Sequence, residues 1–152
     1  MSSIDALIDS TDEFFRRHWT SCIAHPTPEW KADWDWKGSV PHHDKRGVYA
    51  LFDEAGKVIY VGLGASVGGG DRTGYGISRR LLAHVITTDK TRGRGHYVPQ
   101  GKWSEVSSLA AIGFPNEYSY LAPALEDYLI ERLAPPRNSS KRRKANVEAI
   151  NA

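Results

Sequence analysis

Three side chains in the second half of the chain have the types and spacing that phosphate chemistry requires. Arg80 and His84 are four residues apart in a segment with helical periodicity, so they project from one face as neighbours. A guanidinium is always charged and planar, which suits it to a phosphate whose charge grows in a transition state. Glu126 borders the apolar side of a second predicted helix, where a carboxylate needs a partner such as a hard divalent cation. These residues predict a metal-assisted phosphate site.

Two tyrosines lie in a pair of predicted strands that precedes these residues. The triplets Gly-Val-Tyr at 47–49 and Tyr-Val-Gly at 60–62 leave ten residues between Tyr49 and Tyr60. This arrangement resembles the two-part signature that names the GIY-YIG nuclease family, in which valine is a common central residue. Two other features fit the family pattern: Arg80 is followed four residues later by His84, and Glu126 is followed 12 residues later by Asn138. The resemblance covers roughly residues 47–138.

The resemblance implies a metal-dependent endonuclease that hydrolyses DNA phosphodiester bonds at a single active site. The implied catalytic residues are Tyr49, Tyr60, Arg80, His84 and Glu126, with Glu126 also binding Mg²⁺ or Mn²⁺. Gly47, Gly62 and Asn138 would be structural residues of the same site. Arg80 would stabilise the pentavalent phosphate, and water would be activated by Tyr49 or by His84. A tyrosine needs its pKa depressed for that task, whereas a histidine does not, and the sequence leaves both open.

The match departs from the family pattern in two places. Many members carry a lysine directly after the second glycine, where this chain has Leu63, and this makes His84 more important. In addition, 17 residues separate Gly62 from Arg80, and the excess is a glycine-rich segment at 64–76. Two alternatives to an enzyme follow: a non-catalytic DNA-binding or interaction module that retains the fold, and a small-molecule-binding protein that uses the glycine-rich segment.

The charge distribution favours a polyanionic partner for most of the chain. Residues 1–36 carry seven acidic and three basic side chains, so the remainder carries 17 basic and 11 acidic ones. Basic segments at 90–102 and 137–144 are expected to flank the cleft and to contact phosphates, with solvated loop charges as the alternative. The expected DNA-contacting residues are Arg72, Arg79, Lys90, Arg92, Arg94, Lys102, Arg137, Lys141, Arg142 and Arg143.

The elements that must position these residues follow from periodicity. We predict a helix over 4–19, a strand hairpin over 46–53 and 57–63, a helix from Ser78 to about Thr88, a strand over 104–114 and a helix over 120–134. Both faces of the hairpin are apolar, so it should be covered on both sides. The expected fold class is α/β, in the α+β sense: a small antiparallel three-stranded sheet flanked by helices. Residues 1–46 would form a helical and Trp/Pro-rich extension on the nuclease domain at 47–140, and 141–152 a basic tail.

The composition limits the remaining possibilities. At 152 residues the chain has the size of one domain. It lacks a signal-peptide pattern and a long apolar run, so we expect a cytoplasmic protein that does not contact membranes. Its single cysteine, Cys22, excludes an intramolecular disulfide. We expect no organic cofactor. One active site per chain implies a nick in DNA, unless a homodimer or a second binding event completes the cut.

Overall fold

A computed structural model describes residues 3–65 and 76–138 of the chain. Within these ranges the chain forms three α-helices, six strands and three short 3-10 helices. In chain order they are α1 (Ile4–His18), β1 (Trp30–Lys31), β2 (Arg46–Phe52), β3 (Val58–Gly64), α2 (Gly76–His84), β4 (Ile86–Thr88), β5 (Tyr97–Pro99), η1 (Gly101–Trp103), β6 (Ser108–Phe114), η2 (Asn116–Tyr118), α3 (Leu121–Leu133) and η3 (Pro136–Asn138). The α+β class expected from the sequence is therefore found.

The central sheet is antiparallel and has four strands in the order β1-β6-β2-β3. The prediction of three strands was wrong because it omitted β1, in which only Trp30 and Lys31 pair with β6. Two residues give no alternating pattern that a sequence can reveal. Strand β6 begins at Ser108 rather than at position 104, because Trp103 belongs to η1. Strand β3 forms one edge of the sheet, and the candidate site described below lies at this edge.

Side chains of β2 alternate between two apolar cores, one on each face of the sheet. Val48, Ala50 and Phe52 contribute to the core under α1 and α3, whereas Tyr49 and Leu51 contribute to the core under α2. The predicted two-sided burial of the hairpin is confirmed. A bulge in the pairing of β2 with β3 falls between Leu51 and Phe52.

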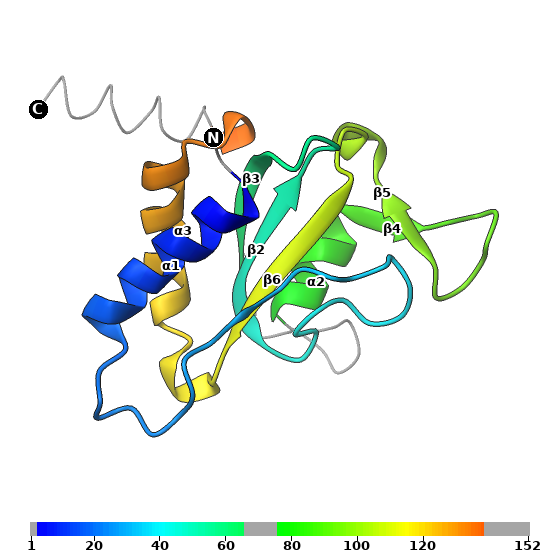
Figure 1. The fold of residues 1–152 in the computed structure, drawn as a ribbon. Helices are drawn as coiled ribbons and strands as arrows, with labels where there is room; N and C mark the ends of the chain where they lie inside the picture. The colour runs from blue at the N-terminus through cyan, green and yellow to red at the C-terminus, as the bar shows by residue number, and fades with distance from the viewer. Residues whose placement is uncertain (1–2, 66–75, 139–152) are drawn as a thin grey trace, which may run out of the picture.

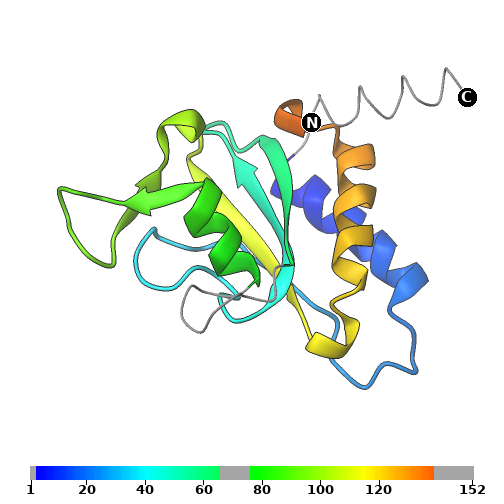
Figure 2. The same ribbon diagram turned by 180° about the vertical axis from the view of Figure 1, so that it is seen from behind.

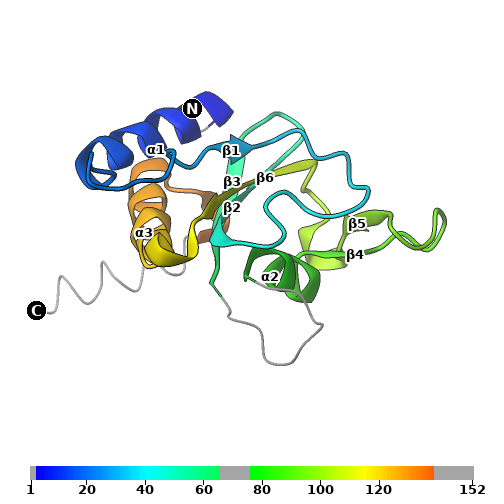
Figure 3. The ribbon, with the colours of Figure 1, turned by 90° about the horizontal axis from the view of Figure 1, so that it is seen from below.

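Helices α1 and α3 cover one face of the sheet and α2 covers the other (Figures 1 and 3). Seen from behind, α2 and α3 lie on either side of the β3 edge (Figure 2). The first segment of the chain supplies part of this architecture. Leu7, Phe14 and Phe15 of α1 are buried in the same core as Leu125 and Leu129 of α3. None of the described helices combines the length and apolar character that a membrane crossing would need.

Helix α2 is shorter than predicted at its C-terminal end. It begins at Gly76, so Ser78 lies within it rather than capping it, and it ends at His84 rather than near Thr88. The chain then enters β4, which pairs with β5 in a second, two-stranded sheet. The β-branched run Ile86-Thr87-Thr88 fits a strand better than a helix end. The segment predicted as a basic loop over 90–102 therefore contains β5 and η1.

Candidate functional site at the β3 edge

The side chain of Tyr49 crosses the neighbouring strand to reach the edge of the sheet. Tyr49 pairs with Gly62 in the β2–β3 register. A Cβ atom added to Gly62 would lie 2.3 Å from Cζ and 2.5 Å from the hydroxyl oxygen of Tyr49. The ring therefore lies directly over Gly62, and its hydroxyl reaches β3 only because this residue has no side chain. Glycine at position 62 is a steric requirement of the Tyr49 position.

Gly47 is required for a different contact. A Cβ atom there would lie 1.9 Å from the carbonyl oxygen of Ile112 on β6 and 3.0 Å from a methyl group of Ile77 on α2. The backbone carbonyl cannot move without disturbing the sheet, so residue 47 must be glycine for β6 and α2 to approach β2. Both glycines of the two triplets thus have structural tasks, one in the sheet and one beneath the tyrosine ring.

The phenol of Tyr49 interacts with three of the other predicted catalytic residues, Tyr60, Arg80 and Glu126, whereas His84 interacts with Arg80. Burial is the largest influence on its pKa and raises it, and the nearby Tyr60 raises it further. A side-chain hydrogen bond with Arg80 and the charge of that guanidinium act in the opposite direction, while the charge of Glu126 again raises the pKa. The rings of Tyr49 and Tyr60 lie 6.1 Å apart between centroids. Groups from β2, β3, α2 and α3 therefore interact around one hydroxyl group.

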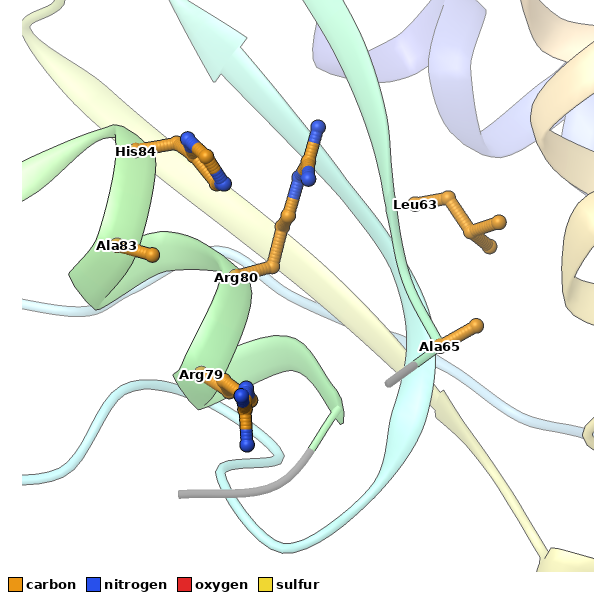
Figure 4. Close-up of a pocket in the computed structure, with 6 residues that line it drawn as sticks. All are labelled: Leu63, Ala65, Arg79, Arg80, Ala83 and His84. Atoms are coloured by element: carbon orange, nitrogen blue, oxygen red, sulfur yellow. The ribbon is translucent and has the colours of Figure 1, made fainter. Parts of the chain in front are cut away.

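Arg80 and His84 share one face of α2 and line a shallow pocket of about 260 Å³ beside β3. Figure 4 shows the Arg80 side chain extending across the pocket towards β3, with the His84 ring pointing towards it. The Arg79 side chain, from the preceding residue, points away from both (Figure 4). Leu63, which stands where many GIY-YIG nucleases have lysine, packs against the core on the α1 and α3 face. The polar groups of this pocket therefore come from α2.

His84 is exposed at the C-terminal end of α2. Partial removal from water, followed by the charges of Arg80 and Lys102, lowers the pKa of its imidazole. A lowered pKa means that the ring is neutral at physiological pH and has a lone pair with which to accept a proton.

Trp103 of η1 connects several of these groups and was not among the predicted catalytic residues. Its indole Nε1–H donates to the carbonyl oxygen of His84 at 2.9 Å, and its ring lies 4.9 Å from that of Tyr60. The Arg137 guanidinium covers the Trp103 ring at 4.0 Å from the centroid. Because Trp103 is enclosed in this way, its ring is not available to stack on a base. A tryptophan directly after the basic segment 90–102 was the one signal in the sequence for a packed element there.

Asn138 fixes the chain after α3 to the exposed edge of β3. Its Oδ1 accepts from the backbone N–H of Val61 at 2.9 Å, and its Nδ2 donates to the carbonyl oxygen of Val61 at 3.0 Å. The side-chain amide thereby pairs with β3 as another strand would. Val61 lies between Tyr60 and Gly62, so this pair of bonds holds the strand at the site.

Glu126 supplies a half-buried carboxylate from α3. In the described ranges no group of three or more His, Cys, Asp or Glu side chains is arranged to hold a metal ion. A single carboxylate is nevertheless compatible with Mg²⁺, which keeps several waters and commonly binds one or two carboxylates together with substrate phosphates. The donor present therefore fits a hard cation that is shared with the substrate.

The basic residues named from the sequence, apart from Arg79 at the pocket, lie in four places. Lys90, Arg92 and Arg94 are exposed in the connection between β4 and β5, and Lys102 lies near His84. Arg137 forms an ion pair with Glu105 and donates to the carbonyl oxygen of Lys102 at 3.1 Å, so its guanidinium is engaged within the protein. Positions outside the described residues are Arg72, Lys141, Arg142 and Arg143.

Comparison of the chain with models of known families, with characterised proteins and with solved structures finds no match.

Proposed function

We propose that this protein is a phosphodiesterase of the GIY-YIG type. One observation carries the proposal: Tyr49, Tyr60, Arg80 and Glu126 come from four elements and interact around a single phenol at the edge of the sheet. Buried tyrosines in an ordinary sheet need no arginine and no carboxylate beside them. A guanidinium that stabilises phosphate charge, phenols that position water or phosphate and a carboxylate that binds a cation can together support an in-line attack on a phosphate.

In particular, we propose an endonuclease that cuts DNA with Mg²⁺ or Mn²⁺. Arg80 binds the scissile phosphate and stabilises the charge of the pentavalent transition state. Tyr60 orients water or phosphate, and the attacking water loses its proton to His84, because burial raises the pKa of Tyr49 and keeps its phenol protonated. Glu126 would hold the divalent ion, and this ion would neutralise the charge on the leaving 3′ oxygen. Asn138 and Trp103 are positioning residues, since they hold β3 and the end of α2 in place.

Incubation of a supercoiled plasmid with the protein and Mg²⁺ tests this function. We expect nicked circles from the wild type, and loss of at least about a hundredfold in rate for Glu126→Gln and for Tyr49→Phe. Asp127→Asn and Tyr120→Phe are the matched controls, because both residues are exposed and have the same side-chain types. Equal nicking by Glu126→Gln and the wild type would show that the site is wrongly assigned. Binding of DNA without cleavage in Mg²⁺ or Mn²⁺ would favour the non-catalytic module.

A further inference from the structure

The hairpin β4–β5 forms an arm that stands apart from the main sheet. We define the arm as residues 86–99; it projects beyond the body of the molecule next to α2 (Figures 1 and 2). Its tip, residues 89–96, carries Lys90, Arg92 and Arg94 but only one acidic residue, Asp89. All three basic residues are exposed. Arg92 Nε donates to Asp89 Oδ2 at 3.1 Å, so the tip holds one internal ion pair and still has an excess of positive charge.

The tip has a defined conformation. Asp89 Oδ1 accepts from the backbone N–H of Thr91 at 2.9 Å and from that of Arg92 at 3.3 Å. The Asp89 N–H donates to the carbonyl oxygen of His96 at 2.8 Å, which joins the two sides of the tip. Gly93 and Gly95 have φ angles of +89° and +88°, which only glycine adopts without strain. These features hold the basic residues in a fixed turn.

The base of the arm is braced from a distant part of the chain. The Tyr97 N–H donates to the carbonyl oxygen of Trp36 at 2.9 Å, and the Gly38 N–H donates to that of Gly95 at 2.8 Å. The Trp34 ring lies 5.2 Å from that of Trp36 and 5.9 Å from that of Tyr97. A solvated loop needs no such support, so the aromatic cluster indicates that the position of the tip matters.

The arm is also fixed relative to the candidate site. It begins two residues after His84, and the Gln100 N–H donates to the carbonyl oxygen of Val85 at 2.7 Å. The Gln100 side chain donates to the carbonyl oxygen of Ile86 at 3.1 Å. The Trp103 indole N–H donates to the carbonyl oxygen of His84. Any polymer bound by the tip would thus be held in a constant register with Arg80 and His84.

We propose that the tip of this arm enters the major groove of duplex DNA when the protein binds its substrate. The inference rests on the proposed nuclease function and specifies its substrate as a B-form duplex. Phosphates line both sides of the groove, and the donors of Arg92 and Arg94 are those that recognise guanine edges and phosphates.

The dimensions of the tip favour this groove over the alternatives. The two sides of the tip are joined as neighbouring strands, about 4.8 Å apart, so with side chains they fit a groove about 12 Å wide but not one about 6 Å wide. Double-stranded RNA has a deep and narrow major groove that side chains do not reach, so it is excluded as the partner.

Binding to a duplex with a filled major groove tests the proposal. The Glu126→Gln protein, which we expect to be inactive, is titrated against a labelled 40-bp duplex and against the same duplex with glucosylated 5-hydroxymethylcytosine at every cytosine. The glucose groups occupy the major groove and leave the phosphates and the minor groove unchanged. A double variant, Arg92→Ala with Arg94→Ala, then removes the two arginine side chains of the tip. Arg16→Ala with Arg17→Ala is the matched control, because these exposed arginines lie on α1, across the sheet from α2.

We expect the parent protein to bind the unmodified duplex at least about tenfold more tightly than the glucosylated one. The arm variant should show no such preference, and its affinity for the unmodified duplex should be at least about tenfold lower. The control pair should bind like its parent. Equal affinity of the parent for both duplexes, or for duplex and single strand, overturns the proposal. If wild-type protein cleaves DNA but the arm substitutions have no effect, only the arm proposal fails. If the predicted binding occurs and the wild type never cleaves, the nuclease function fails and the arm proposal is supported.

Discussion

At the scale of single residues, the site depends on where the Tyr49 hydroxyl is placed. The ring extends from β2 across β3 at Gly62, and Arg80 bonds to its hydroxyl from α2. This geometry explains why one triplet ends and the other begins in tyrosine while glycine stands opposite Tyr49 in the strand pair. Helical periodicity placed Arg80 and His84 on one face of α2, as the structure has them, whereas the expectation that residues of four elements form one site came from the family resemblance.

The first prediction concerns Gly62→Ala. The added methyl group occupies the position of the Tyr49 ring, so the ring must move, and a shift of about 1 Å in a catalytic group costs about a hundredfold in rate. Overpacking should also lower the free energy of unfolding by about 1–3 kcal/mol. Plasmid nicking and urea denaturation measure the two effects. Gly101→Ala is the control, since nothing lies within 4 Å of its added Cβ, and it should keep full activity. Full activity in Gly62→Ala would contradict the proposed role of the Tyr49 position.

At the scale of elements, η1 was the part that the sequence did not reveal. Its three residues give no periodic signal. Nevertheless, Trp103 contacts Tyr60 and His84, and the charge of Lys102 lowers the pKa of the His84 imidazole. The same is true of β1 and the β4–β5 arm, whose short strands are recognised only through their partners. By contrast α1, β2, β3 and α3 were predicted within about two residues of their observed ends, because each has a long apolar pattern.

The second prediction concerns the pH dependence of cleavage if His84 is the proton acceptor. The pKa of His84 lies below 6.5, so the rate should rise with pH as the ring loses its proton and should level off in the neutral range. Lys102→Ala removes one charge that lowers this pKa, so the rising limb should move to higher pH. His84→Gln should remove the limb together with most of the activity. Nicking rates at saturating protein between about pH 5 and pH 9 measure these changes. If the rising limb of the pH profile persists in the His84→Gln variant, or if the wild-type rate continues to rise towards alkaline pH, Tyr49 rather than His84 would be the proton acceptor.

At the scale of the whole molecule, residues 3–46 pack against the rest of the protein and contribute to its core. Phe15 is 5% exposed, and its ring contacts those of Phe14, Trp19 and Phe114. Farther along, Trp30 extends the sheet, and Trp34 and Trp36 brace the arm. The sequence predicted that these tryptophans pack on the body but could not assign their partners, because each contact joins residues far apart in the chain.

The third prediction follows from this shared core. Phe15→Ala should lower the free energy of unfolding by about 3–5 kcal/mol, since it leaves a cavity between α1 and β6. Ile8→Ala on the same helix should cost less than about 1 kcal/mol, because Ile8 is 39% exposed. Urea unfolding followed by tryptophan fluorescence and by circular dichroism should give one common transition for each variant. Separate transitions, or equal costs for the two substitutions, would show that α1 folds independently.

The amide of Asn138 has one more effect, which concerns the behaviour of the protein at high concentration. A β-sheet edge with free N–H and C=O groups is a template on which other chains assemble into aggregates. Asn138 occupies both backbone groups of Val61 in the middle of β3, and the opposite edge is formed by β1, which is only two residues long. The same bonds that hold β3 at the candidate site therefore also occupy part of an edge on which another chain could pair, so we expect Asn138→Ala to aggregate more readily at high protein concentration.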